Sequence, residues 1–354
     1  ISRELFNEFR QKYPYPKIGD ILISASGSIG RTVEYKGEDE YFQDSNIIWL
    51  AHDERLCNIF LKQIYSIIKW NGLEGSTIKR LYNKNILETA FHIPNSECKK
   101  ESIAEQKQIG EFFQNVDSLI NANQRKLDKL KNIKKACLEK MFPRKGSTIP
   151  EIRFKGFTEE WVEKELKNVC TIRTGYPFDS IDFNENGIYR VITNGNIQDD
   201  SAIVDNLFGN KINIYDKCII NEYVLNIGDI LVTMDGTVGR TAKVDNHNMV
   251  LAQRVGRLTA IGNAEFLYQL LNVGGFYKEM TIISVGGTIK HISLSDIGDY
   301  LTSIPTDISE ENKIGNFFKN LDNLIAKNEQ QLEKLKNIKK ACLEKMFVNK
   351  EDAI

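Results

Sequence analysis

A fourteen-residue segment occurs twice in this chain without a single change. Residues 129–142 and 334–347 both read KLKNIKKACLEKMF. The likeness continues on the N-terminal side at the same separation of 205 residues, so that Phe112-Phe113 aligns with Phe317-Phe318. Self-similarity at a fixed separation indicates a repeated architecture. A chain with one such segment in its middle and another near its end is predicted to consist of two similar halves.

Each copy is predicted to be one long helix. In the first copy the positions of the apolar side recur at steps of three and four, apart from one step of seven, which places them on one side of a helix. Neither Pro nor Gly interrupts residues 111–142, and Pro143 ends the run. A rod with one apolar side needs a partner, and the other rod is the obvious candidate. We therefore expect an antiparallel pair in which residues 129–142 pack against residues 334–347. The positions of this apolar side are Ile109, Phe113, Val116, Ile120, Asn123, Leu127, Leu130 and Cys137.

The region before each rod repeats as well. Residues 227–231 match residues 18–22, and residues 236–241 match residues 27–32, both at a separation of 209. The first region contains strand patterns at residues 21–24, 30–35 and 46–50, and a helical pattern at residues 57–70. Between the matching anchors the two regions are barely alike. The sequence thus predicts two domains of one fold with divergent surfaces.

The predicted fold class is α+β, with two similar α/β domains separated by two long helices that form an antiparallel coiled coil. Seventy-seven residues lead from Pro150 to Ile227, but only 17 precede Ile18. About 60 residues of the first domain are therefore expected to be absent, if the domains are equally long. The predicted parts are a first domain at 1–100, a first rod at 101–149, a second domain at 150–306 and a second rod at 307–354.

Several function classes are excluded or disfavoured by missing motifs. None of the seven prolines is adjacent to another, which excludes the D/N-P-P-Y/F loop of amino-methyltransferases. No G-x-x-x-x-G-K-[ST] is present, so an ATPase is not expected. The six cysteines form no C-x-x-C pair and the four histidines stand alone, which argues against a metal site and fits the cytosol. We find no catalytic constellation and expect a protein that acts by recognition.

Polar turns supply candidate contacts for DNA, since base edges and phosphates need hydrogen-bond donors, acceptors and basic side chains. For any single residue, a capping or surface role is at least as probable on this pattern. The candidates are Ser28, Arg31, Thr77, Lys79, Arg80, Tyr176, Asn194, Asn196, Thr237, Arg240, Thr288, Lys290 and His291.

The net charge of −1 conceals a strongly basic stretch. The segment from Arg125 to Lys145 contains nine basic residues and only two acidic ones, Asp128 and Glu139. A solvated helix face is the default interpretation of such a run, and a surface for a partner or for phosphates is the alternative. Candidate partner-binding residues are Lys131, Lys134, Lys135, Lys336, Lys339 and Lys340.

Several motifs together resemble a known family. Residues 150–157, which read PEIRFKGF, are followed by Trp161 and Leu166. The I-G-D-I-L strand, the G-T-I-K segment before I-P, and the A-E-Q-K-Q-I start of a rod that ends in L-E-K-M-F complete the pattern. This combination, which covers the whole chain, resembles the specificity subunits of type I restriction–modification enzymes. The extra residues after Ile93-Pro94 depart from the family pattern.

The resemblance implies a non-catalytic subunit with two target-recognition domains, each of which reads one half of a split site in double-stranded DNA. The rods would set the spacing of the half-sites. They would also dock two methyltransferase subunits, which carry S-adenosylmethionine, and restriction–translocation subunits, which use ATP and Mg²⁺. Two other interpretations stay open: the recognition part of a related fused nuclease or methylase system, and a coiled-coil adaptor that binds proteins at both ends.

Overall fold

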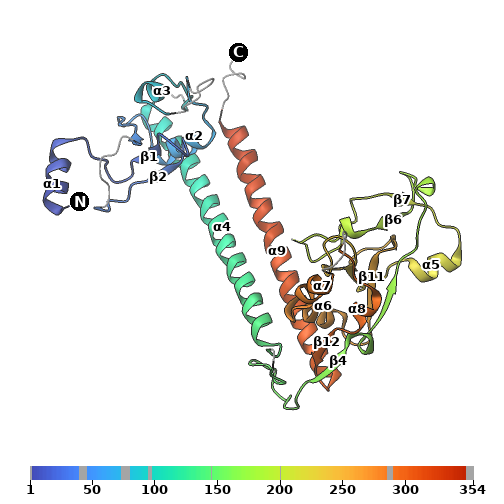
Figure 1. Cartoon of the computed structure of the whole chain (residues 1–354). Coiled ribbons are helices and arrows are strands. Elements are labelled where there is room, and N and C mark those ends of the chain that lie inside the picture. Colours follow the sequence, from blue (N-terminus) through green and yellow to red (C-terminus); the bar gives the residue numbers. More distant parts are fainter. Residues whose placement is uncertain are drawn as a thin grey trace. The chain divides into compact units, whose positions relative to one another are not determined.

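The computed structural model describes residues 2–39, 46–72, 80–94, 98–144, 146–199, 201–284 and 290–347. The chain divides into two compact units (Figure 1). Unit 1 comprises residues 1–127 and 328–354, and unit 2 comprises residues 128–327. The two rods are α4 (Lys99–Lys140) and α9 (Ile308–Met346), and both are continuous helices across the division. Each unit therefore contains one domain together with part of each rod.

The domain of unit 1 is a small sheet covered by short helices. Strand β1 lies in the middle of the order β2-β1-β3, and both of its neighbours are antiparallel to it. Ile21 and Ile23 of β1 point into a core that α2 closes with Leu61 and Tyr65. The elements are α1 (Arg3–Lys12), β1 (Ile21–Ser24), β2 (Thr32–Glu34), β3 (Ile47–Trp49), α2 (Asn58–Ile67) and α3 (Asn83–Leu87).

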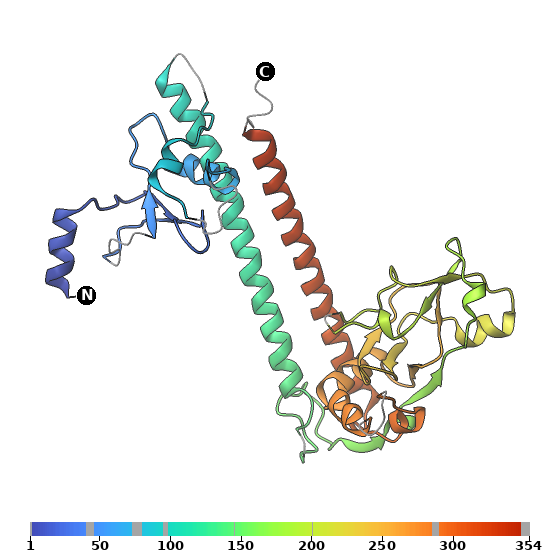
Figure 2. The same ribbon diagram turned by 45° about the horizontal axis from the view of Figure 1, so that its top comes forward.

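The domain of unit 2 contains three sheets, of orders β5-β11-β8-β9, β10-β6-β7 and β12-β4. All four residues of β8 are buried, because the two faces of its sheet contact different core clusters. Figure 2 shows the domain beside the N-terminal part of α9. The strands are β4 (Val162–Glu165), β5 (Cys170–Thr174), β6 (Tyr189–Ile192), β7 (Lys211–Ile212), β8 (Ile230–Thr233), β9 (Thr241–Lys243), β10 (Met249–Leu251), β11 (Val255–Ala260) and β12 (Leu301–Ile304). The helices are η1 (Leu166–Asn168), η2 (Ser180–Asp182), η3 (Asn194–Asn196), α5 (Lys217–Tyr223), α6 (Ala264–Val273), α7 (Phe276–Ile283) and α8 (Leu294–Gly298).

The two domains share a core, as the repeated motifs predict. Strands β1 and β2 correspond to β8 and β9 at the predicted separation of 209 residues. In both hairpins the two turn glycines have positive φ, 67° and 83° at Gly27 and Gly30 and 71° and 81° at Gly236 and Gly239. These left-handed conformations favour glycine, which explains the G-x-x-G spacing. The G-x-x-G-R-T motif is therefore confirmed as a strand-to-strand turn.

The rods run antiparallel within each unit. In unit 1, Asn328 donates to the carbonyl of Asn123 at 3.0 Å, and Lys339 pairs with Asp117 at 2.7 Å. The residue number thus falls along α4 as it rises along α9, which is the pattern of antiparallel helices. In unit 2, Lys134 pairs with Asp322 at 2.6 Å. The ion pair in unit 2 is the equivalent of the one in unit 1 at a separation of 205 residues. The predicted antiparallel arrangement is confirmed.

The predicted contact between the two identical segments is wrong. Phe347 contacts Phe113 in unit 1, and Phe142 contacts Phe318 in unit 2, with ring centroids 5.9 and 6.0 Å apart. Each identical segment thus packs against the N-terminal half of the other rod. The physical reason is direction, because antiparallel helices bring the end of one to the beginning of the other.

Each rod also carries a glycine where a domain helix abuts it. A Cβ atom on Gly110 would lie 2.6 Å from Ile59 of α2, and one on Gly315 would lie 2.1 Å from Asn263, the N-cap of α6. Next to each domain helix stands a buried polar residue of the rod. The main-chain N–H of Cys57 donates to Gln106 at 2.9 Å, and that of Asn263 donates to Glu311 at 3.4 Å. The rods therefore complete the N-termini of α2 and α6.

The PEIRFKGF segment of unit 2 is attached to the first turns of α9. Arg153 forms two hydrogen bonds with Glu310, at 2.6 and 2.8 Å, and the side chain of Glu310 is 1% exposed. The Lys313 ammonium lies 4.6 Å from the Phe157 ring centroid. The contact between Arg153 and Glu310 uses two nitrogens of the planar guanidinium, a geometry that arginine provides and lysine does not. The motif is accordingly a structural attachment of the domain to its rod.

The Gln106 and Glu311 equivalence generates a prediction. Burial raises the pKa of Glu311, so the ionised carboxylate destabilises the fold above that pKa. The cost decreases as the pH falls through the folded-state pKa and is absent below the unfolded-state value of about 4.3. Glu311→Gln should therefore raise Tm at pH 7 to 8, by an amount that shrinks toward pH 4.

Thermal unfolding followed by circular dichroism across this pH range measures the effect. Glu333→Gln, which changes an exposed carboxylate on the same helix, should leave Tm unchanged. A Glu311→Gln protein less stable than the parent at pH 8 would contradict the interpretation.

Candidate functional site

The described candidate residues of unit 1 lie in the turn between β1 and β2 and in the segment before α3. Ser28 and Arg31 are exposed in the turn between β1 and β2, where the Arg31 N–H donates to the Ser28 carbonyl at 3.3 Å. The guanidinium of Arg80 lies 5.9 Å from the Tyr82 ring centroid. Thr77 and Lys79 lie outside the described residues. Ser28 and Arg31 remain accessible for a ligand.

The equivalent turn of unit 2 differs in what its side chains do. Thr237 is exposed, and its carbonyl accepts a hydrogen bond from the Thr233 hydroxyl at 2.5 Å. Arg240, which corresponds to Arg31, forms an ion pair with Asp199 and is only 27% exposed. This pair attaches the hairpin to the segment after η3. Arg240 therefore has a structural partner in the domain, whereas Arg31 is exposed at the matching position.

A short segment beside the end of β8 brings further candidates together. Gly236 donates to the Lys290 carbonyl at 3.0 Å, and Ile292 donates to the Met234 carbonyl at 2.9 Å. This pairing places His291 against Asp235, with 2.5 Å between Nδ1 and Oδ1. Lys290 and His291 are both exposed, and Thr288 lies outside the described residues.

Two amides of η3 have different roles. Asn194 accepts a hydrogen bond from the Met234 N–H at 3.3 Å and is partly exposed, so it lies next to Asp235. Asn196 is 0% exposed. Its side chain accepts from the Thr193 N–H at 2.9 Å and donates to the carbonyls of Asp205 and Phe208 at 2.7 and 2.8 Å. The prediction that Asn196 contacts a base is wrong, because its hydrogen-bonding groups are used within the domain.

Tyr176 lies beside the turn between β10 and β11. Its ring contacts Phe178 and Tyr223, with centroids 5.0 and 5.3 Å away, and it is half-buried. Its main chain accepts from the Gln253 N–H at 3.0 Å and donates to the Leu251 carbonyl at 2.9 Å. Tyr176 thereby fixes the turn between β10 and β11.

Sequence reasoning missed two residues, Arg254 in this turn and Asp235 in the segment after β8. Arg254 follows Gln253, and its Nη1 atom lies 3.3 Å from Oδ2 of Asp235. A single arginine after a short strand carries no pattern that distinguishes it from other surface arginines. Asn194, Asp235, Arg254, Lys290 and His291 together form what we call the Asp235 cluster. Its exposed members offer guanidinium, ammonium, imidazole and amide groups, which suit base edges and phosphates.

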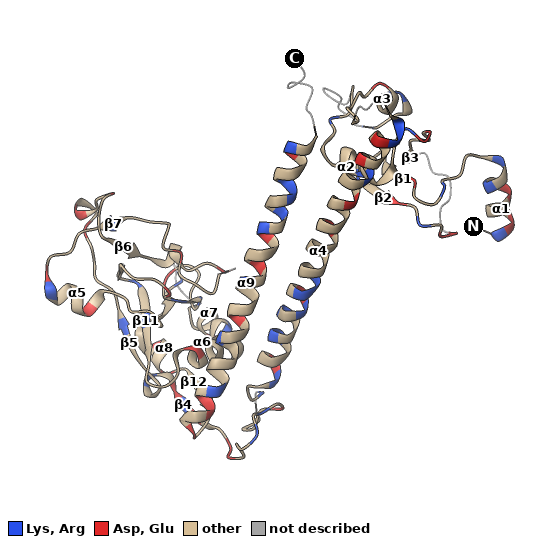
Figure 3. Ribbon diagram, turned by 180° about the vertical axis from the view of Figure 1, so that it is seen from behind, with Lys and Arg blue, Asp and Glu red and all other residues tan. Residues whose placement is uncertain are grey.

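The rods carry the second candidate surface. Figure 3 shows Lys and Arg gathered over the C-terminal parts of α4 and α9. Lys134 and Lys339 form the ion pairs between the rods, and each side chain is 23% exposed. These two lysines therefore hold the rods together and are poorly placed to bind a partner. The candidates that lie exposed are Lys131, Lys135, Lys336 and Lys340.

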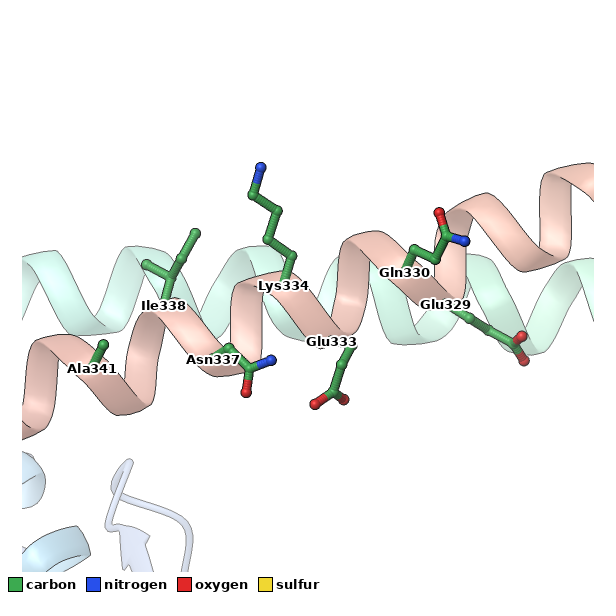
Figure 4. A pocket seen from close by; sticks show the side chains of 7 residues that line it. All are labelled: Glu329, Gln330, Glu333, Lys334, Asn337, Ile338 and Ala341. Atoms are coloured by element: carbon green, nitrogen blue, oxygen red, sulfur yellow. The ribbon is translucent and has the colours of Figure 1, made fainter. Parts of the chain in front are cut away.

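Two equivalent isoleucines are exposed among these lysines. Ile133 of α4 is 39% exposed and Ile338 of α9 is 42% exposed. Ile338 and Lys334 belong to a shallow groove on α9, and Figure 4 shows both side chains pointing to the same side of the helix. The repeat places this pattern once on each rod.

Metal centres and membrane spans would indicate other function classes. Among the described residues, no group of three or more His, Cys, Asp or Glu side chains is arranged to hold a metal ion. In the same part of the chain, no helix is both long and apolar enough to span a membrane.

Comparison with known proteins defines the class. The family model described as "Type I restriction modification DNA specificity domain" matches residues 1–132 and 158–337. The chain therefore belongs to the family of type I restriction–modification specificity subunits. It is 24% identical over 352 residues to the type I restriction enzyme MjaVIII specificity subunit of Methanocaldococcus jannaschii, covering 94% of this chain and 76% of that protein.

A second relative, S.HindORF215P of Haemophilus influenzae, is also named as a specificity subunit. It is 50% identical over 123 residues, which are 34% of this chain and only 30% of that protein. The fold is similar to the crystal structure of the type I restriction–modification S subunit from M. genitalium, with a TM-score of 0.53 and 15% identity over 96% of this chain and 85% of that one. The predicted family and fold class are confirmed.

The role of Asn196 can be tested directly. Asn196→Ala removes side-chain bonds to buried main-chain groups and leaves those groups without partners. We expect a loss of about 2–4 kcal/mol in the free energy of unfolding. Denaturant unfolding measures it, and Asn186→Ala, at an exposed position of the same domain, serves as control. Unchanged stability together with altered ligand binding would return Asn196 to the candidate contacts.

Proposed function

We propose that this chain is the DNA-recognition subunit of a type I restriction–modification complex. In this proposal, each domain reads one half of a bipartite site in double-stranded DNA, and the rods set the spacing between the halves. The observation that supports it best is the combination of a shared core with different turn chemistry. The hairpins superimpose in sequence and φ, yet Arg31 is exposed where Arg240 is ion-paired. Two domains with the same hairpin backbone and different exposed side chains suit the recognition of two different DNA sequences.

The division of labour with other subunits follows from the same proposal. Two methyltransferase subunits would dock on the rods and supply S-adenosylmethionine, and restriction subunits would supply ATP and Mg²⁺ chemistry. This chain would supply base contacts and position, and the complex would act in the cytoplasm. The repeated pattern of an exposed isoleucine among lysines, once on each rod, supports the binding of two copies of one partner.

An exchange of one domain tests the recognition function. Residues 150–305 are replaced by the equivalent region of a relative with a known target, and the methylated sites of the host are mapped by sequencing. We expect one half of the recognised sequence to change while the other half stays the same. The rods are untouched in this chimera, so the assembly with methyltransferase subunits provides the control. A change of both half-sites, or of neither, would show that the domains do not read separately.

Substitutions of the exposed isoleucines test the docking surface. Ile133→Ser and Ile338→Ser should each weaken binding of one methyltransferase copy by about tenfold, because a buried apolar contact of an interface is lost. The double variant should weaken both. Native mass spectrometry of the assembled complex gives the stoichiometry. Ile282→Ser, at an isoleucine of α7 that is 62% exposed, is the matched control and should change nothing. Full occupancy by two copies in the double variant would place the docking surface elsewhere.

A further inference from the structure

Arg254 has a backbone conformation that is unusual for an arginine. It is the last of the three residues that connect β10 to β11, and its φ is 69°. Among the described residues the only other non-glycine with positive φ is Asn248, at 60°, and asparagine tolerates this region well. An arginine there costs about 1–2 kcal/mol that glycine would not. Strain of this kind is concentrated at functional sites, which directs attention to the side chain.

The guanidinium of Arg254 is both exposed and oriented. The side chain is 67% exposed, and Nη1 contacts Oδ2 of Asp235 at 3.3 Å. Asp235 is itself held, because its other oxygen is 2.5 Å from Nδ1 of His291, and its side chain is 17% exposed. The carboxylate therefore engages the Nη1 group of the guanidinium. The remaining donors of the planar group are directed to solvent in a defined plane.

The turn that presents Arg254 is fixed on a rigid frame. Gln253 and Leu251 are both hydrogen-bonded to the main chain of Tyr176, and Ala252 donates to the Ile192 carbonyl at 3.0 Å. Gly175 packs so closely that a Cβ atom there would lie 2.1 Å from the Ala252 carbonyl oxygen. Arg254 then leads into β11, an interior strand of the four-stranded sheet. A donor group on such a frame loses little freedom on binding.

We propose that Arg254 is a specificity-determining residue that reads a guanine in the half-site bound by the domain of unit 2, with Asp235 and His291 as positioning residues. Guanine presents O6 and N7 side by side in the major groove, and both accept from one guanidinium. A phosphate would gain nothing from the neighbouring Asp235, whose negative charge repels it. An oriented arginine beside a carboxylate therefore suits an uncharged base edge better than a phosphate. The inference rests on the proposed function of DNA recognition.

The test uses the full chain assembled with its methyltransferase subunits. Binding is measured on duplexes in which each base pair of the half-site is varied in turn, at several salt concentrations. We expect the parent complex to prefer guanine at one position of this half-site by about 5- to 150-fold. Arg254→Lys, which keeps the charge but not the fork, and Arg254→Gly should abolish the preference at that position alone. Arg254→Gly should in addition have a Tm at or above that of the parent, since it relieves the backbone.

Two further variants complete the experiment. Asn248→Gly changes the other left-handed residue and should leave every preference unchanged. Asp235→Asn should reduce the same guanine preference without affecting the other half-site. Uniformly weaker binding to all sequences with a shallower salt dependence in Arg254→Gly would overturn the proposal in favour of a phosphate contact. So would intact preferences in both Arg254 variants. A parent complex without any sequence selectivity would instead refute the proposed function itself.

Discussion

The rest of the structure depends on one interaction, the packing of aromatic residues at the ends of the rods against the domain cores. In unit 2, Phe142, just after the end of α4, stacks on Phe266 of α6 with ring centroids 5.6 Å apart, and it also contacts Trp161 and Phe318. In unit 1, Phe347, directly after the end of α9, contacts Phe60 of α2 and Phe113. Each domain core is therefore completed by a phenylalanine from the end of one rod and a second one from the beginning of the other. Apolar burial of this size is worth roughly 1.5–3 kcal/mol per side chain, so domain and rods are predicted to form one cooperative core within each unit.

The repeat explains why both units use the same contacts, but it also introduces differences. Gln106 and Glu311 occupy equivalent positions in α4 and α9, and each accepts from the first residues of the adjacent domain helix. The neutral amide does this without the cost that the buried carboxylate incurs. The two halves therefore share a geometry and differ in their dependence on pH.

Most of the architecture could be predicted from the sequence because it is written as periodicity and repetition. The predicted strand at residues 21–24 has the bounds of β1, and the predicted helix at residues 57–70 contains α2 (Asn58–Ile67). The register of the rods could not be predicted from identity alone, since identical segments have identical propensities and no preference for one another. Asn196 and Arg254 mark the limit for the site. Asn196 differs from the exposed amides in its burial, and Arg254 is oriented by the Asp235 carboxylate from the segment after β8. Both features depend on tertiary contacts that leave no local pattern.

The division of the chain between the units has a consequence for biosynthesis. Unit 2 is one continuous stretch, but unit 1 combines residues 1–127 with residues 328–354. The ribosome makes the second of these stretches after the whole of unit 2. The first domain must therefore wait for Phe347, which contacts Phe60 and Phe113 and is synthesised about 230 residues after Phe113. Closing such a long loop slows folding, and the exposed apolar residues are a risk in the meantime. The domain that is synthesised first is thus the last to be completed, and a chain that stops short of α9 would leave it with an open core.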